Sequence, residues 1–180
     1  MASSLYTTYK KEVVPQLKKE LELGNIMQVP KITKVVLNVG YGRQHKDKAY
    51  IDTVERTLTI ISGQKPIHNK SRKSISNFKI RQGQPIGVSV TLRGDQMYDF
   101  LYKLINITLP RVRDFRGLNG KAFDRQGNYA IGFKEHVAFP EVGADGVEKI
   151  HGLQVVISTT AKDKNEGYTL LKALGFPFKS

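Results

Sequence analysis

The sequence predicts an α+β fold: an antiparallel sheet with helices packed on one face, plus a long basic loop. Short apolar strands are mixed with amphipathic helices, and there is no regular alternation of strand and helix that would indicate a parallel sheet. The chain has 180 residues, of which 39% are hydrophobic, so we expect a single domain (1–180) with a substantial core. The uncovered face of the sheet is then free to bind a partner.

Four segments have the spacing of amphipathic helices, at residues 4–23, 47–62, 95–109 and 163–174. In the first, Pro15 should kink or split the helix, because it removes a backbone donor. Gly63 and Gly175 stand where a helix ends in a left-handed residue. Asp95 is expected to cap the third helix, and Pro110 to stop it. The first helix should bury residues that recur every four positions: Leu5, Tyr9, Val13, Leu17 and Leu21.

Strands are indicated by β-branched runs and by alternation of apolar and polar residues. Residues 31–39 and 153–160 read as strands, and 66–69 as a short extended piece. Residues 86–92 alternate cleanly, which predicts Thr91 on the open face and Val88 and Val90 inward. Residues 121–133 predict a hairpin that turns at 125–128.

The charge distribution points to a polyanionic partner. The formal net charge is +13, and the 39 residues from Arg56 to Gly94 contain eight bases and no acid. A solvated face usually mixes both signs, because like charges repel one another, so a long segment of one sign favours nucleic acid as partner. An anionic membrane would also satisfy the charge. However, there is no apolar stretch of about 20 residues to span one.

Residues 70–85 predict a long, mobile basic loop that carries five bases among Ser, Asn and Gln. Phe78 within it could stack on a nucleobase or anchor the loop to the core, and the sequence does not choose between these. A charged loop without any partner is the alternative for this cluster. A second basic stretch makes that alternative less favourable: Arg111, Arg113, Arg116 and Lys121.

Catalytic, metal and cofactor chemistry are not indicated. Cysteine is absent, which excludes disulfides and thiolate metal sites, and the polar start lacks the apolar core of a signal peptide. Gly40-Tyr41-Gly42 lacks the third glycine of a dinucleotide site, and residues 117–121 lack the spacing of a P-loop. No nucleophile and base can be paired. The histidines are scattered and are expected on the surface or in loops: His45, His68, His136 and His151.

Several runs of residues, in order along nearly the whole chain, resemble large-subunit ribosomal protein five of the bacterial or organellar type. The runs are MQVP (27–30), LNVG (37–40), ISGQKP (61–66), RKS (72–74), FKIRQG (78–83), TLRG (91–94), PRVRDFRG (110–117), GNY (127–129) and GFPF (175–178). The first 26 residues match less specifically.

The resemblance implies a structural protein without cofactors, on a cytoplasmic or organellar ribosome. Its partners would be 5S rRNA, 23S rRNA, P-site tRNA, small-subunit ribosomal protein thirteen and neighbouring large-subunit proteins. The implied rRNA contacts are Asn38, Ser62, Gln64, Lys65, Thr91 and Arg93. The implied tRNA contacts are Arg72, Lys73, Ser74, Asn77, Lys79, Arg81 and Gln82. Further RNA contacts would be Arg111, Arg113 and Arg116, and the protein bridge would use the acidic loop 135–148 with Glu141 and Asp145.

Two other function classes stay open at this point. A free RNA chaperone would bind RNA broadly, without preference for 5S rRNA. An enzyme acting on RNA would need catalytic residues that the sequence does not suggest.

Overall fold

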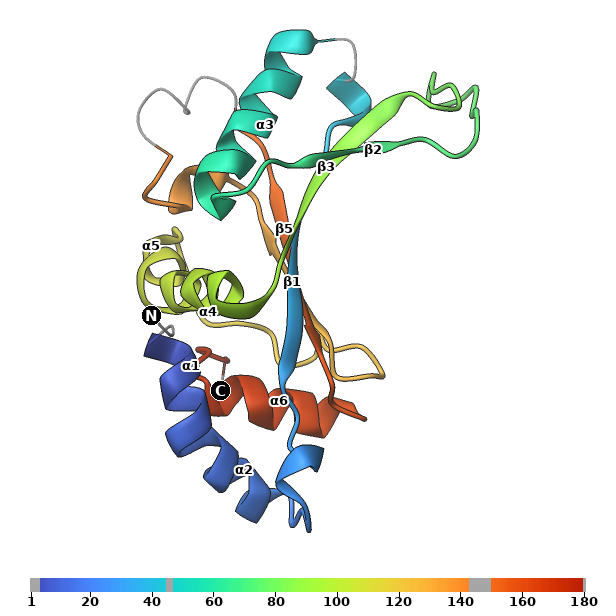
Figure 1. Ribbon diagram of the computed structural model, residues 1–180. Coiled ribbons are helices and arrows are strands. Elements are labelled where there is room, and N and C mark those ends of the chain that lie inside the picture. Colours follow the sequence, from blue (N-terminus) through green and yellow to red (C-terminus); the bar gives the residue numbers. More distant parts are fainter. Residues whose placement is uncertain (1–3, 45–46, 143–149, 180) are drawn as a thin grey trace. The chain divides into compact units, whose positions relative to one another are not determined.

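The computed structural model, which describes residues 4–44, 47–142 and 150–179, confirms the α+β fold (Figure 1). Among these residues, five strands form one antiparallel sheet in the order β2-β3-β1-β5-β4. The strands are β1 (Ile32–Gly40), β2 (Ile67–Lys70), β3 (Pro85–Leu92), β4 (Tyr129–Phe133) and β5 (Leu153–Thr159).

Helices of several kinds accompany the sheet. The α-helices are α1 (Ser4–Thr8), α2 (Val14–Glu20), α3 (Lys48–Ser62), α4 (Gly94–Lys103), α5 (Leu109–Arg111) and α6 (Lys164–Ala173). Two π-helices, η1 (Tyr9–Val13) and η4 (Leu104–Thr108), join α1 to α2 and α4 to α5. Short 3₁₀-helices are η2 (Ile26–Gln28), η3 (Gly42–Gln44) and η5 (His136–Ala138).

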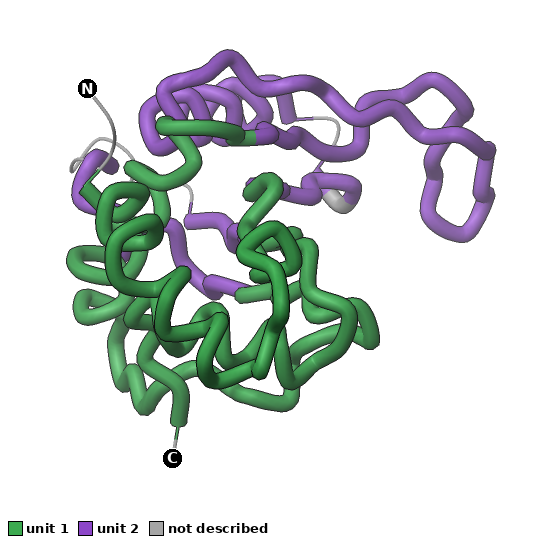
Figure 2. Tube along the Cα trace, turned by 60° about the horizontal axis from the view of Figure 1, so that its bottom comes forward, with its two compact units in different colours: residues 1–35, 92–131, 156–180 green, residues 36–91, 132–155 purple. Residues whose placement is uncertain are grey.

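The chain forms two compact units that alternate along the sequence (Figure 2). Unit 1 comprises residues 1–35, 92–131 and 156–180, and unit 2 comprises residues 36–91 and 132–155. The expectation of one domain over 1–180 stays a prediction.

In unit 2, helix α3 begins and ends where the sequence predicts. Asp47 caps it by accepting a hydrogen bond from Tyr50 N at 3.2 Å, and Gly63 ends it with φ 68°. Its buried face consists of Val54, Thr57, Leu58 and Ile61. The helix thus covers one face of the sheet and leaves the other open.

Unit 1 contains two helices that pass through a proline in the same way. Val14 and Leu109 precede Pro15 and Pro110 and are both helical, although a residue before proline is normally pushed away from that conformation. A π turn stands just before each proline, where Val14 N donates to Tyr9 O and Leu109 N to Leu104 O. The wider turn makes room for the ring, so Pro15 interrupts the α-helix as predicted without ending it.

The π turn also explains the burial pattern of the first helix. Positions four apart drift by about 40° per step around an ideal α-helix, so a long run of them leaves the buried face. A π turn has more residues per turn and reverses part of that drift. Accordingly Leu5, Tyr9, Val13 and Leu17 are all buried, while Leu21 is half-buried.

Three predictions in unit 1 were wrong in part. Asp95 does not cap the third helix, because α4 begins at Gly94 after the extended Arg93 and Asp95 lies in its first turn. Pro110 does not stop the helix, which continues through α5 to Arg111 because the π turn accommodates the ring. In the expected hairpin 121–133, only the second arm is a strand, and the first arm pairs through a single bridge from Phe123 to Tyr129. The turn itself is as predicted, since Asp124 Oδ1 accepts from Gln126 N and Asn128 N.

The hairpin turn of unit 1 packs backbone against backbone on helix α6. Gly127 has φ 72°, and a Cβ added there would lie 2.6 Å from both the Ala161 Cβ and the Asp163 carbonyl oxygen. A Cβ added at Gly167 would lie 2.5 Å from the Gly127 carbonyl oxygen. Only glycine fits at these two positions.

Candidate nucleic-acid interface

The uncovered face of the sheet in unit 2 carries four polar side chains, which we call the open face: Asn38, Asn69, Ser89 and Thr91. The exposed Ile67 lies on the same side, because it pairs with Ser89 across β2 and β3. Asn38 alternates with buried Leu37 and Val39 on β1, and Thr91 is exposed between buried Val90 and Leu92 on β3. The amide and hydroxyl groups of this face can both donate and accept hydrogen bonds. Ser89 and Asn69 already orient each other, since Ser89 Oγ donates to Asn69 Oδ1 at 3.2 Å.

The end of α3 contributes a tight, hydrogen-bonded turn at Ser62, Gln64 and Lys65. The Ser62 hydroxyl donates to Leu58 O at 2.6 Å and accepts from Gln64 N at 3.2 Å. The proton and one lone pair of the Ser62 hydroxyl are therefore used in hydrogen bonds that stabilise the turn. The sequence did not suggest this stabilising role. Lys65 is exposed and Gln64 is half-buried, so the turn presents a cation and an amide.

The basic loop is a continuation of the β2–β3 hairpin with bonds of its own, and is less structureless than the sequence predicted. Ser71 N donates to Gln84 O, and the backbones of Ile75 and Ile80 bond to each other in both directions at 3.0 and 3.2 Å. Gln82 N donates to Ser74 Oγ at 2.9 Å. Figure 1 shows β2 and β3 running side by side into this hairpin.

The side chains at the end of the hairpin face solvent. Residues 72–79 and Arg81 are all exposed, and we call four of them the basic tip: Arg72, Lys73, Lys79 and Arg81. Phe78 is 66% exposed, so the alternative in which it anchors the loop to the core is wrong. Asn77 and Gln82 are exposed beside it.

The remaining basic candidates lie in unit 1. Arg93 is the extended residue that precedes α4, with φ −142°, and its side chain is exposed. Arg111 ends α5, Arg113 and Arg116 follow it, and all three are exposed as well. The structure thus places Asn38, Thr91 and the basic tip in unit 2, and these four arginines in unit 1.

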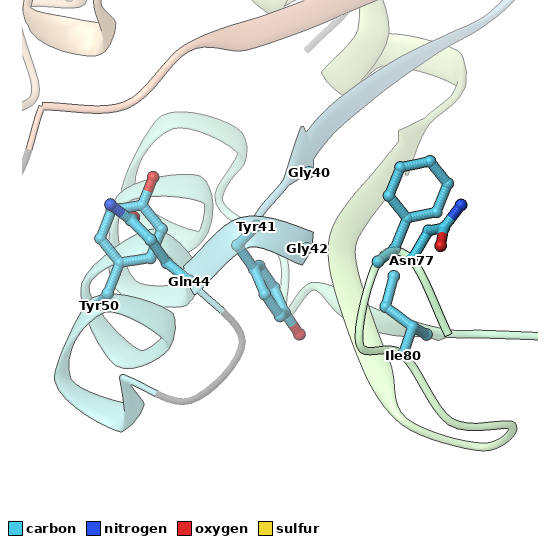
Figure 3. A pocket seen from close by; sticks show the side chains of 8 residues that line it. Gly40, Tyr41, Gly42, Gln44, Tyr50, Asn77 and Ile80 are labelled. Atoms are coloured by element: carbon cyan, nitrogen blue, oxygen red, sulfur yellow. The ribbon is translucent and has the colours of Figure 1, made fainter. Parts of the chain in front are cut away.

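A chain of hydrogen bonds holds the turn after β1 in place within unit 2. The Tyr41 hydroxyl lies 3.1 Å from His68 Nδ1, and His68 Nε2 lies 3.2 Å from Glu55 Oε2 on α3. Burial, followed by the charge of Glu55, raises the pKa of Tyr41. Tyr41 is therefore a fixed, neutral side chain. It forms part of an open hollow shared with Gly42, Gln44 and residues of the hairpin (Figure 3).

Two histidines expected on the surface or in loops are buried against each other. The rings of His136 and His151 stack in parallel, with centroids 4.0 Å apart, and the exposed fractions are 0% and 4%. His151 N donates to His136 Nδ1 at 3.2 Å, and His136 N donates to His151 O at 3.1 Å. The pair closes the base of the loop that carries the acidic residues. No sequence signal joins these two residues, because their spacing of 15 matches no motif.

Burial, and then the neighbouring His136, lower the pKa of His151 to about 4. Its Nε2 is buried without a hydrogen-bond partner among the described residues. His151 is therefore neutral at physiological pH, and the stacked pair serves as packing.

Of the acidic loop, Glu141 is half-buried in a turn closed by Val142 N to Phe139 O at 3.2 Å. Asp145, like Glu148, lies outside the described residues. The described part of the chain holds no cluster of three metal-ligating side chains, and none of its helices is long and apolar enough to cross a membrane.

Comparison with known proteins decides between the function classes. Residues 25–81 match the family model for ribosomal protein L5, and residues 85–178 match that for the ribosomal L5P family C-terminus. The chain belongs to the ribosomal protein L5 family. The large ribosomal subunit protein uL5 of Halothermothrix orenii is 52% identical over 98% of both chains. The uL5 proteins of Francisella tularensis subsp. novicida and subsp. mediasiatica are 56% and 55% identical, the former over 96% of both chains.

Membership of the L5 family confirms the resemblance and the expectation of a structural ribosomal protein that is not an enzyme. The bacterial relatives agree with the expected place on a cytoplasmic ribosome. RNA binding is typical of the family, which fits the charge of the hairpin and the polar open face.

Proposed function

We propose that this L5 protein binds 5S rRNA through the open face of unit 2 and the turn at the end of α3, and so attaches it to the central protuberance of the large subunit. The observation that carries this proposal is the row of amide and hydroxyl groups on the sheet at Asn38, Asn69, Ser89 and Thr91, the last three of which lie in the acid-free segment 56–94. Such groups fit the backbone and 2′-hydroxyls of RNA, which a protein reads by shape.

Two exposed cations would add charge to this binding, Lys65 in unit 2 and Arg93 in unit 1. Lys65 and Arg93 are exposed and suit phosphate contacts, and Gln64 suits a ribose or base edge. Arg111, Arg113 and Arg116 would contact RNA elsewhere, with 23S rRNA as the expected strand. Ser62 would act mainly by holding the turn.

The basic tip, with Ser74, Asn77 and Gln82, would contact P-site tRNA. Every elongating tRNA must be accepted at that place, so the contact should be tolerant of sequence. Four cations and several neutral donors on a solvent-exposed hairpin suit such a contact, because phosphates carry most of the affinity and no sequence information.

The acidic loop would form the bridge to small-subunit ribosomal protein thirteen. Glu141 is the candidate among its described residues, and Asp145 is the second candidate. Acids favour a basic partner through complementary charge. Neighbouring large-subunit proteins are the other expected contacts.

The test is a filter-binding titration of the purified protein against 5S rRNA, with an unrelated RNA of equal length as control, at two salt concentrations. Affinity should fall by roughly 0.7 to 0.9 log units per neutralised phosphate for each log of salt. We expect 5S rRNA to keep a clear advantage at the higher salt. If both RNAs bind alike and are released together, the protein is a general RNA binder, as a chaperone would be, and the proposal fails.

A further inference from the structure

We propose that the hollow between the hairpin and the turn after β1 is a slot for one unpaired nucleobase of an RNA strand. It has a volume of about 790 Å³ and lies wholly within unit 2 (Figure 3). Asn77, Phe78 and Ile80 of the hairpin line one side, and Gln44 and Tyr50 line the other. This inference rests on the proposed RNA binding and adds a base-recognising site to it.

Phe78 provides the stacking surface. Its side chain is 66% exposed, although exposed phenyl rings are unfavourable in water. The tight turn beneath holds it out, since Lys79 N donates to Ser76 O at 2.9 Å and Lys79 adopts φ 56°. An aromatic ring presented in this way, among cations, can stack on any base while the cations neutralise the adjacent phosphates.

Polar groups and glycines complete the slot. Asn77 and Gln44 are exposed amides, and an amide can match both the donors and the acceptors of a base edge. Gly40 and Gly42 leave the backbone open, since a Cβ added at Gly40 would meet nothing within 4 Å and one at Gly42 only Ile86 O, at 4.0 Å. None of the described residues that line the slot is a carboxylate that would repel a phosphate.

The side of the slot that the turn after β1 forms is already ordered without RNA. Tyr41 is only 2% exposed, and its hydroxyl is held by His68, which is held in turn by Glu55. Side chains that are already ordered lose little conformational entropy when RNA binds. The stacking of a single base can therefore contribute measurably to the affinity.

The test compares a fluorescein-labelled six-nucleotide oligoadenylate with a strand of the same length that lacks its bases. The two strands carry the same phosphates and differ only in their bases, which are the groups that would enter the slot. We expect the full protein to bind oligoadenylate more tightly, and Phe78→Leu to lose about five- to tenfold of that affinity, as expected for one base stack, with no change for the abasic strand. Tyr102→Leu is the matched control, because Tyr102 is an aromatic residue 46% exposed in unit 1, and it should change neither affinity.

A second variant gives a direct signal. The chain contains no tryptophan, so Phe78→Trp introduces a single indole at the slot. Oligoadenylate should quench its fluorescence and the abasic strand should not. Equal binding of both strands by the parent protein, or an unchanged affinity in Phe78→Leu, would overturn the slot.

A 5S rRNA titration of the parent protein separates the two proposals. If 5S rRNA keeps its advantage but the bases of the oligonucleotide have no effect, only the slot is wrong. If 5S rRNA has no advantage, the proposed function itself fails.

Discussion

Acidification should destabilise unit 2 through the stacked histidines. In the folded chain, His151 is buried against His136 and packs edge-on to Tyr50, with centroids 6.5 Å apart. A proton on His151 would place a charge in this site, next to a second imidazole and with no acceptor for Nε2 among the described residues. The unfolded chain has no such penalty, so it takes up the proton first.

The magnitude follows from the two pKa values. The pKa of His151 is lowered from 6.5 to about 4 on folding. This stability is fully present above the unfolded value and is lost as the pH falls toward the folded value. Between pH 7.5 and pH 5, the unfolded state binds about one proton more, and the free energy of unfolding should fall by about 2 kcal/mol, at about 1.4 kcal/mol per pKa unit.

Urea titrations at these two pH values measure the effect, with His151→Gln as the comparison. The glutamine variant loses stability at both pH values but has no proton to gain at this site. Groups far from this site titrate equally in both proteins, so the difference between their two pH dependences isolates the stacked histidine site. If the parent and the variant lose the same stability on acidification, the assignment of a neutral, buried His151 is wrong.

Three further predictions concern the hairpin, the open face and the glycine contact. Replacing all four residues of the basic tip by alanine should leave 5S rRNA affinity nearly intact but weaken tRNA binding to reconstituted ribosomes; equal loss of both would contradict the division of roles. Thr91→Ala should weaken 5S rRNA binding by about 1 kcal/mol in filter binding through a lost hydrogen bond, and unchanged affinity would remove Thr91 from the interface. Gly127→Ala should cost about 2 kcal/mol or more in thermal unfolding, because its Cβ would overlap Ala161 and the backbone at Asp163. A neutral result there would show that the turn can move aside.

Local signals in the sequence were enough for most of the elements. Asp47 and Gly63 mark the ends of α3 by chemistry that depends only on neighbouring residues, and both were predicted. Pro110 was predicted to stop a helix because the sequence does not reveal that a π turn will make room for its ring. The first arm of the 121–133 hairpin failed for a different reason. There, Phe123 packs with Tyr168 and Phe178 from the end of the chain, which sequence periodicity cannot reveal.

The part of the candidate site that could be predicted is the part in which residue type and strand alternation determine which side chains are exposed. Thr91 is exposed as its alternation predicts, and the basic tip is exposed as its charge suggests. The RNA contact of Ser62 stays a prediction, and its hydroxyl also makes two hydrogen bonds at the helix end that its residue type alone does not reveal. His136 and His151 were assigned to the surface because only the closure of the loop brings them together.

The two π turns lie in helices of unit 1 that are far apart in the sequence but pack against each other. Helix α1 packs against α4, and Tyr6 and Tyr98 meet between them at 4.9 Å. Each helix has a π turn just before its own proline, Pro15 in one and Pro110 in the other. If one proline were replaced, that helix would revert to a regular α-helix while the other kept its π turn. The packing of α1 against α4 would then be weakened. The two prolines should therefore behave as an epistatic pair, in which the second replacement costs less once the first has been made.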